Sequence, residues 1–279
     1  MSARGFSLPG TNGKGVLLVH GLTGAPGEMK YLARKLNRAG FAVSAPLLAG
    51  HGHDAPTLLK TTWRDWLESL SESADRLGSE VDSMSVAGIC VGGALGLMLA
   101  AERGGIDAAA VYSMTFTYDG WNMKSWYSLT ARCLQHVAHW PGLRVLSFAE
   151  PYPFGLKDEK LREAVAKPDS NLIDGALDRL PMGSLYEMYH LGRHVERVGR
   201  SIQVPTLILH AREDDMSDPR NAYRLRDALG GPVRLELLED SYHMIHVDQE
   251  RDRVAALTAD FFDAAHAARA RPQREATHG

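Results

Sequence analysis

The feature that most constrains the fold is a repeated alternation between short apolar runs and segments in which apolar residues have helical spacing. Runs at residues 16–20, 84–89 and 206–210 are rich in small and branched side chains and predict buried strands. Helical patterns follow the first two runs, at residues 27–38 and 91–103. This alternation predicts a mostly parallel, doubly wound sheet with helices on both faces, because a parallel crossover needs a long connection.

The remaining elements continue the alternation. Further strands are expected at residues 41–46, 107–113 and 233–238, and further helices at residues 62–77, 219–229 and 249–264.

The alternation is interrupted between about residues 117 and 198, where helix-like pieces are punctuated by prolines. Because the strand pattern resumes afterwards, we interpret residues 117–198 as a helical cap over one end of the sheet. The core would then comprise residues 1–116 and 199–266, and the Ala/Arg-rich residues 267–279 would form a flexible tail.

Aromatic residues are dense in the expected cap. They are Tyr118, Trp121, Trp126, Tyr127, Trp140, Phe148, Tyr152, Phe154, Tyr186 and Tyr189. We expect Tyr118, Trp121, Phe154 and Tyr186 to bind substrate; the alternative is that the aromatics are ordinary core residues of a structural subdomain.

Composition excludes several classes of function. The 279 residues carry a formal net charge of −3, so no basic field is available for nucleic acid or an anionic membrane. No stretch is long enough to span a membrane, and the first residues lack the apolar run of a signal peptide. Two cysteines, Cys90 and Cys133, argue against a disulfide framework. We therefore expect a cytoplasmic protein without metal or organic cofactor, since no ligand cluster has metal spacing.

The stretch "SVAGICVGG" predicts a sharp turn between the strand at 84–89 and the helix at 91–103. Gly88 and Gly92 stand two residues before and two after Cys90, where a tight strand-to-helix turn requires small residues. The helix N-terminus directs its N–H groups at the thiol and favours the reactive thiolate. Cys90 is thus a candidate nucleophile; the alternative is a structural cysteine in a glycine-rich bend.

Further motifs make the chain resemble α/β-hydrolases of the bacterial carboxylesterase and monoacylglycerol-lipase-like branch. "LLVHGLTG" resembles the His-Gly loop of that family, with a structural histidine at His20. The resemblance implies that the N–H groups of Leu22 and Val91 form the oxyanion hole. "GHG" at 50–52 and "TWRDW" at 62–66 resemble loop and packing signatures, and we expect His51 and His53 to lie in a solvated loop.

The acid and the base of the family follow the last two strands. In "LHAREDDMSDP" the resemblance implies Asp214 as the acid, with Asp215 as its first alternative and Asp218 as a helix-capping residue. In "EDSYHMIHVDQERD" it implies His243 as the base, whereas His246 is expected to pack or to be solvated. Nucleophile, acid and histidine thus follow one another in the chain order of α/β-hydrolases.

Cysteine in place of the family's usual serine affects the choice of substrate. Some relatives, such as dienelactone hydrolases and polyhydroxyalkanoate synthases, use cysteine in this frame, and "GICVGG" resembles the synthase box locally. Thiolate is a good leaving group, so attack favours thioesters and activated esters over amides.

These features lead us to expect an ester or thioester hydrolase, with coenzyme A and carrier-protein thioesters among its candidate substrates. The alternatives are an acyltransferase that uses the same residues and a non-catalytic binder of small molecules that has kept the fold.

Overall fold

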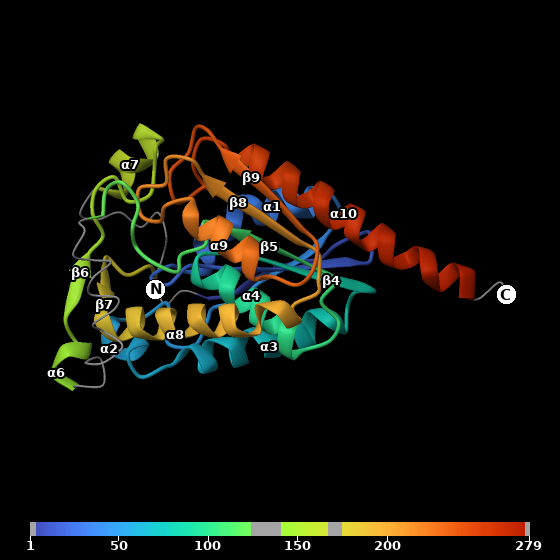
Figure 1. Ribbon diagram of the computed structural model, residues 1–279, viewed down its shortest axis with the longest axis horizontal. Coiled ribbons are helices and arrows are strands. Elements are labelled where there is room, and N and C mark those ends of the chain that lie inside the picture. The colour runs from blue at the N-terminus through green and yellow to red at the C-terminus, as the bar shows by residue number, and fades with distance from the viewer. Residues whose placement is uncertain (1–3, 124–140, 167–174, 277–279) are drawn as a thin grey trace.

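The computed structural model describes residues 4–123, 141–166 and 175–276, and a seven-stranded sheet lies at its centre (Figure 1). In spatial order the strands are β1 (Phe6–Leu8), β3 (Ala42–Ala45), β2 (Lys14–Val19), β4 (Ser83–Ile89), β5 (Ala108–Tyr112), β8 (Thr206–Ala211) and β9 (Val233–Leu238). Neighbouring strands are parallel except at the edge, where β1 pairs antiparallel with β3. The predicted mostly parallel sheet is confirmed. The edge strand β1 was not predicted, because three residues are too few to show a periodic pattern.

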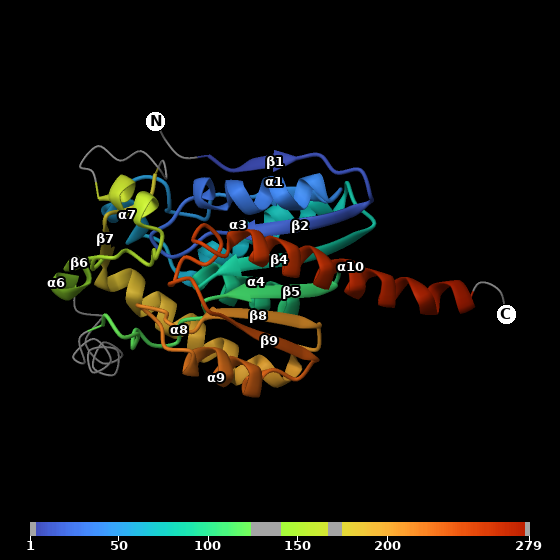
Figure 2. The same ribbon diagram turned by 90° about the horizontal axis from the view of Figure 1, so that it is seen from above.

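Helices cover both faces of this sheet (Figure 2). One face carries α1 (Lys30–Arg38) and α10 (Arg251–Ala276), which contact each other. The other face carries α3 (Trp63–Gly78), α4 (Val91–Glu102), α8 (Met182–Val198) and α9 (Arg220–Ala228). Short helices η1 (Pro26–Met29), α2 (Ala55–Leu58) and η2 (Gly199–Ser201) join the larger elements.

The central helix α4 owes its position to small residues. It contacts β2, β4 and β5 as well as α3 and α8, so it is enclosed on several sides. A Cβ on Gly93 would lie 2.7 Å from the side chain of Val111, and one on Gly96 would lie 2.9 Å from that of Val86. These distances are shorter than a van der Waals contact, so only glycine lets α4 approach the sheet this closely.

The start of α3 explains why the sequence contains a Thr-Trp-Arg-Asp run. Thr62 precedes the helix, and its backbone N–H donates to Asp65 Oδ2 at 2.7 Å, which completes a capping box. Trp66, one residue further on, is fully buried, and its indole N–H donates to Thr61 Oγ1 at 2.9 Å. The run is therefore a helix start and a packing signature, as expected.

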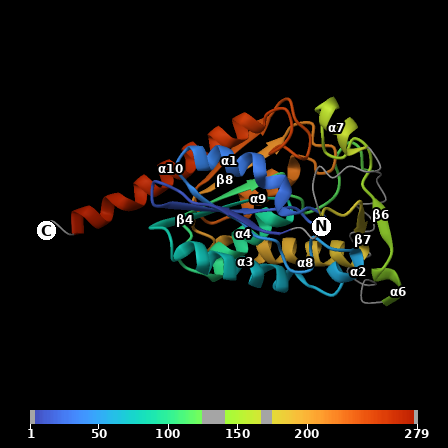
Figure 3. The same cartoon turned by 180° about the vertical axis from the view of Figure 1, so that it is seen from behind.

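Between β5 and β8 the structure describes α6 (Pro141–Arg144), β6 (Ser147–Ala149), α7 (Glu159–Val165), β7 (Arg179–Pro181) and α8. The first four of these elements lie at the end of the sheet at which the parallel strands finish (Figure 3). The sequence predicted helices only, but β6 and β7 form a small antiparallel sheet. The helix α8 packs on α3, α4 and α9, alongside the core.

The division of the chain into a core and a cap at residues 117 and 198 stays a prediction. Four residues named in the sequence analysis lie outside the described residues: Trp126, Tyr127, Cys133 and Trp140.

The C-terminal helix corrects one expectation. The sequence predicted a helix ending near residue 264, whereas α10 continues to Ala276 and extends beyond the sheet (Figure 1). The flexibility of residues 267–279 stays a prediction. Alanine and arginine, which dominate the segment after residue 264, are both strong helix formers, and this accounts for the extension. Among the helices described, none combines the length and the apolar character needed to cross a membrane.

Candidate active site

Cys90 stands at the turn between β4 and α4, with a backbone conformation that few residues adopt. Its φ is 51° and its ψ is −114°, and its side chain is 5% exposed. A Cβ on Gly88 would lie 2.4 Å from the backbone of Gly92, and a Cβ on Gly92 would lie 2.3 Å from Val19 O. Both glycines are therefore required for the turn, as the sequence predicted, and they hold Cys90 in a strained position above the sheet.

His243 and Asp214 come together from the loops after β9 and β8. The Nδ1 atom of His243 lies 2.9 Å from Asp214 Oδ2 and 3.0 Å from Asp214 Oδ1. Cys90 lines the same cavity as His243, and its side chain contributes to raising the pKa of the imidazole. Cys90, His243 and Asp214 are all buried, and the structure brings the three predicted residues together.

This environment determines the charge of the histidine. Burial disfavours the imidazolium, but Asp214 and then Cys90 outweigh burial, and the pKa of His243 lies well above its ordinary value. Burial likewise opposes ionisation of Asp214, yet the facing His243 holds the pKa of Asp214 below its ordinary value. The pair is thus arranged as an imidazolium beside a carboxylate.

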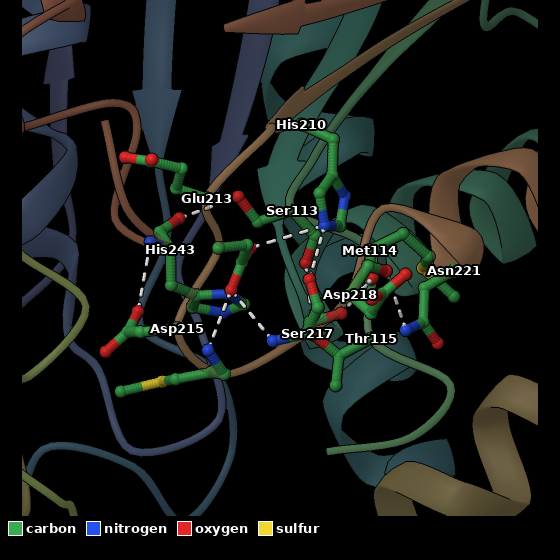
Figure 4. A network of polar contacts seen from close by, with 12 residues as sticks. Ser113, Met114, Thr115, His210, Glu213, Asp215, Ser217, Asp218, Asn221 and His243 are labelled. Carbon is green, nitrogen blue, oxygen red and sulfur yellow. Dashed lines mark hydrogen bonds and ion pairs between the residues drawn. The ribbon is translucent and has the colours of Figure 1, made fainter. Parts of the chain in front are cut away.

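Asp214 and Asp215 are adjacent in sequence but bind different partners, and Figure 4 shows Asp215 beside the backbone of His243. Asp214 also accepts the backbone N–H groups of Met216 and Ser217, at 2.9 and 2.8 Å. Asp215 accepts the backbone N–H groups of Gly155 and His243, at 3.1 and 3.3 Å, rather than the imidazole. Burial and the neighbouring Asp214 raise the pKa of Asp215 to about 6.

The other two polar residues considered in these loops take structural positions. Asp218 Oδ1 accepts the backbone N–H of Arg220, the first residue of α9, at 2.9 Å, which suits its expected capping role. His246 is fully buried, and burial together with the neighbouring His243 lowers its pKa to about 3. His246 is therefore a packed, neutral side chain rather than a second base.

The loop that carries His243 is attached on two sides by hydrogen bonds. Ser113, which follows β5, donates its hydroxyl to His243 O at 2.6 Å. Asp248 accepts the backbone N–H groups of Tyr242, Lys157 and Asp158, at 2.7, 2.9 and 2.8 Å respectively. The base is therefore fixed both to the sheet and to the segment between β5 and β8, and the Asp in "DQE" was not predicted to do this.

The loop after β2 provides another wall of the site. His20 Nδ1 contacts Gly21 O at 2.9 Å, and its Nε2 accepts the Leu48 N–H at 3.2 Å, which confirms a structural histidine. Leu22 lines the cavity beside Cys90, and Val91 is the first residue of α4, where helix N–H groups lack intrahelical partners. Leu22 thus lies in the loop after β2 and Val91 at the start of α4, and their role as oxyanion donors stays a prediction.

His51 corrects an expectation of the sequence analysis. It was expected in a solvated loop, but it is buried, and its Nδ1 contacts Ala49 O at 3.0 Å. Its ring makes edge contacts with the rings of His20 and Trp66, at centroid distances of 5.0 and 5.3 Å. The packing of the loop under α3 therefore encloses it, whereas His53 is exposed.

A cavity of about 700 Å³ opens at Cys90 and His243. Two of the predicted substrate-binding aromatics, Tyr118 and Phe154, line it. Trp121 is 60% exposed and donates its indole N–H to Glu213 O at 2.9 Å, and its ring packs on Tyr242. Tyr186 packs against His190 on α8. Neither Trp121 nor Tyr186 belongs to the described lining, because these contacts place them elsewhere.

The lining also contains charged residues that the sequence analysis missed. Glu28 is 4% exposed and accepts the Gly21 N–H at 2.8 Å, and burial raises its pKa to about 7. Glu150 accepts the hydroxyl of Thr23 at 2.7 Å, and burial raises its pKa. Both carboxyl groups lie near His243. The isolated glutamates gave no sequence signal, because nothing in their local pattern marks them as buried.

Comparison with known proteins identifies the family of the chain. A model of the Hydrolase_4 family, described as "Serine aminopeptidase, S33", matches residues 11–250. The chain belongs to this family. It is an α/β-hydrolase-type enzyme of the ester hydrolase class, which confirms the predicted fold and the predicted kind of enzyme.

Individual relatives agree with this placement. The chain is 26% identical over 249 residues to a thermostable monoacylglycerol lipase of Bacillus sp. strain H-257, covering 89% of this chain and 90% of the relative. It is 26% identical over 260 residues to a carboxylesterase of Bacillus subtilis, covering 90% and 92%. The crystal structure of a monoacylglycerol lipase of Paleococcus ferrophilus shares the fold, with a TM-score of 0.75, 19% identity and coverage of 95% and 100%.

The described residues offer no group of three or more His, Cys, Asp or Glu side chains placed to hold a metal ion. The polar groups that meet in the cavity are instead those of acyl transfer: a thiol, an imidazole, a carboxylate and a helix N-terminus.

Proposed function

We propose that the protein hydrolyses carboxylic esters or thioesters through an acyl-enzyme formed on Cys90. The observation that carries the proposal is the hydrogen bond between His243 and Asp214 next to Cys90, at a cavity that can enclose an acyl group. His243 would serve as the base and Asp214 as the group that orients it. The names of the relatives, a monoacylglycerol lipase and a carboxylesterase, support small ester substrates.

The proposed reaction has two steps. The thiolate of Cys90 attacks the carbonyl carbon, and the N–H groups of Leu22 and Val91 stabilise the oxyanion that forms. The bond to the leaving alcohol or thiol then breaks, and this group takes a proton from His243. In the second step His243 accepts a proton from water, whose oxygen attacks the acyl carbon. The bond to sulfur then breaks, which releases the carboxylic acid and restores the thiolate beside the imidazolium.

The electrostatics support this division of roles. A His243 pKa above its ordinary value favours the imidazolium, which can pair with a thiolate and can later protonate the leaving group. Asp214, ionised beside His243, holds the proton of the ring on Nδ1. The Nε2 atom is then directed at the reacting groups, as a general acid and base requires.

A thiol nucleophile favours thioesters and activated esters. Attack on a thioester exchanges one thioester for another, so neither direction is strongly favoured. With an amide, the thiolate leaves the tetrahedral intermediate more readily than the amine, and the substrate re-forms.

Transfer of the acyl group to an alcohol or amine is the second candidate function, because the apolar walls formed by Leu156, Leu177 and Val247 can exclude water from the acyl-enzyme.

Intact-mass measurement after incubation with matched ester and thioester panels tests the proposal. We expect an adduct of the acyl mass on Cys90, its decay with release of free acid, and no adduct in Cys90→Ala. An adduct that persists until an alcohol or amine is added would identify the transferase instead. Turnover by Cys90→Ala, or the absence of any adduct and of any turnover across the panel, would contradict the proposal and leave the non-catalytic binder.

A further inference from the structure

Three basic residues line the cavity that contains Cys90. Lys30 and Arg34 stand four residues apart on α1, so they share one face of that helix, and Arg251 is the first residue of α10. The two helices contact each other on the same face of the sheet (Figure 2). The basic cluster, meaning Lys30, Arg34 and Arg251, therefore belongs to one wall of the site.

The nearby acidic residue, Asp252, forms its ion pair outside this cluster. Asp252 accepts the hydroxyl of Tyr31 at 2.7 Å and forms an ion pair with Lys35 at 2.5 Å. Arg251 instead lies over the ring of Tyr31, 5.0 Å from its centroid, and donates to Val247 O at 3.0 Å. Within the described part of the chain, no carboxylate forms an ion pair with Lys30, Arg34 or Arg251.

The acidic residues of the cavity lie around a different loop. Glu150 accepts the Thr23 hydroxyl, and the backbone N–H of Leu177, next to Asp178, donates to Thr23 O at 2.8 Å. Glu28 accepts the Gly21 N–H from the same loop. Acidic side chains are thus gathered at residues 21–24, whereas the unpaired cations come from α1 and α10.

We propose that the basic cluster binds a phosphate group carried by the acyl donor, so that the substrate is a phosphate-bearing ester or thioester. This inference rests on the proposed function and specifies its substrate class. Three cations suit a phosphate dianion better than a single carboxylate, and the planar guanidinium groups can bind two oxygens at once. A phosphopantetheine thioester and an acylglycerol phosphate both have this chemistry.

Two matched pairs of substrates test the inference. The first pair is an acyl-pantetheine thioester and its 4′-phosphate, and the second is a monoacylglycerol and the corresponding acylglycerol phosphate. For the wild type we expect kcat/KM to be higher for the phosphorylated member of at least one pair. In Lys30→Ala/Arg34→Ala this ratio should fall by roughly tenfold to a hundredfold, as lost charge-assisted contacts require. The pair that responds identifies the source of the phosphate.

Arg38→Ala is the control variant, because Arg38 is an exposed cation on α1 outside the cavity lining. This variant should keep the wild-type ratio of kcat/KM between the phosphorylated and the unphosphorylated substrate.

Raising the ionic strength should lower this ratio in the wild type more than in the double variant. A ratio near one in the wild type, or an equal fall in the control, would overturn the inference. Turnover of the uncharged members with acylation of Cys90 would still support the proposed function, so the two failures are distinguishable.

Discussion

The loops at the ends of the sheet strands and the segment between β5 and β8 contribute to the same cavity, but they are held in different ways. Cys90 and Asp214 follow the largely buried strands β4 and β8, and close glycine contacts restrict the turn at Cys90. His243 follows the less buried strand β9, and Ser113 binds its backbone carbonyl. In the other segment α7 has no buried residue. The loop at Gly155 is held by two hydrogen bonds of the Gly155 backbone. Its N–H donates to Asp215 Oδ2, and its carbonyl accepts the N–H of Met244 at 2.8 Å. The contrast suggests that the sheet fixes the chemistry, whereas the connecting segment adjusts which substrate fits.

The largest loss of activity should come from a substitution in the loops at the strand ends. Cys90→Ala removes the proposed nucleophile, and we expect kcat to fall on the order of 10⁶-fold. Ser184→Ala is the matched change on α8, because Ser184 is buried and its hydroxyl has no partner among the described residues. Steady-state kinetics should show near wild-type activity for Ser184→Ala. Substantial activity in Cys90→Ala would assign the nucleophile elsewhere.

The two neighbouring aspartates sharpen the comparison further. Asp214→Asn should lower kcat on the order of 10⁴-fold, because an amide can stabilise the wrong tautomer of His243. Asp215→Asn should have a much smaller effect on kcat, since Asp215 binds backbone N–H groups of Gly155 and His243. Kinetics of both variants at saturating substrate provide the test, and the reverse ranking would make Asp215 the catalytic acid.

Asp215 joins the two regions, and its ionisation should affect stability. Its pKa rises from 3.8 to about 6 on folding, so the folded protein binds this proton more tightly than the unfolded chain. The resulting stabilisation is present at low pH and is lost as the pH rises from about 4 through 6, by roughly 3 kcal/mol. Urea unfolding of wild type and Asp215→Asn across this range measures it. As the pH rises, the free energy of unfolding of the wild type should decrease relative to that of Asp215→Asn. A difference between the two proteins that does not change with pH would contradict the raised pKa of Asp215.

The smallest effect should separate aromatics within the connecting segment. Phe154 lines the cavity, so Phe154→Ala should change the kcat/KM ratio of long to short acyl substrates by about tenfold. Trp121→Ala should leave this ratio unchanged, because Trp121 is exposed and packs on Tyr242. Melting temperatures and the rate of Cys90 alkylation by a small reagent show whether either variant loses its fold. A larger change of selectivity in Trp121→Ala would restore the assignment made from the sequence.

Much of the catalytic end of the fold could be predicted because its signals are local. The β4 turn needs glycine at positions 88 and 92 for reasons confined to a few residues, and the apolar runs of β2, β4, β5 and β8 predict buried strands directly. The short strands β6 and β7 and the extension of α10 escaped prediction. Their patterns are brief or lack apolar periodicity, so tertiary contacts and helix propensity decide them.

The sequence by itself determined the parallel sheet, the strained turn at Cys90 and the order of the candidate nucleophile, acid and base. Only the tertiary structure decided that the carboxylate of Asp214 faces the imidazole while that of Asp215 binds backbone, since adjacent side chains differ in direction and not in pattern. It also decided that Tyr118 and Phe154 line the cavity and that α1 and α10 bring three cations to it. A cavity wall is assembled from segments far apart in the chain, and no local pattern specifies which of their side chains meet.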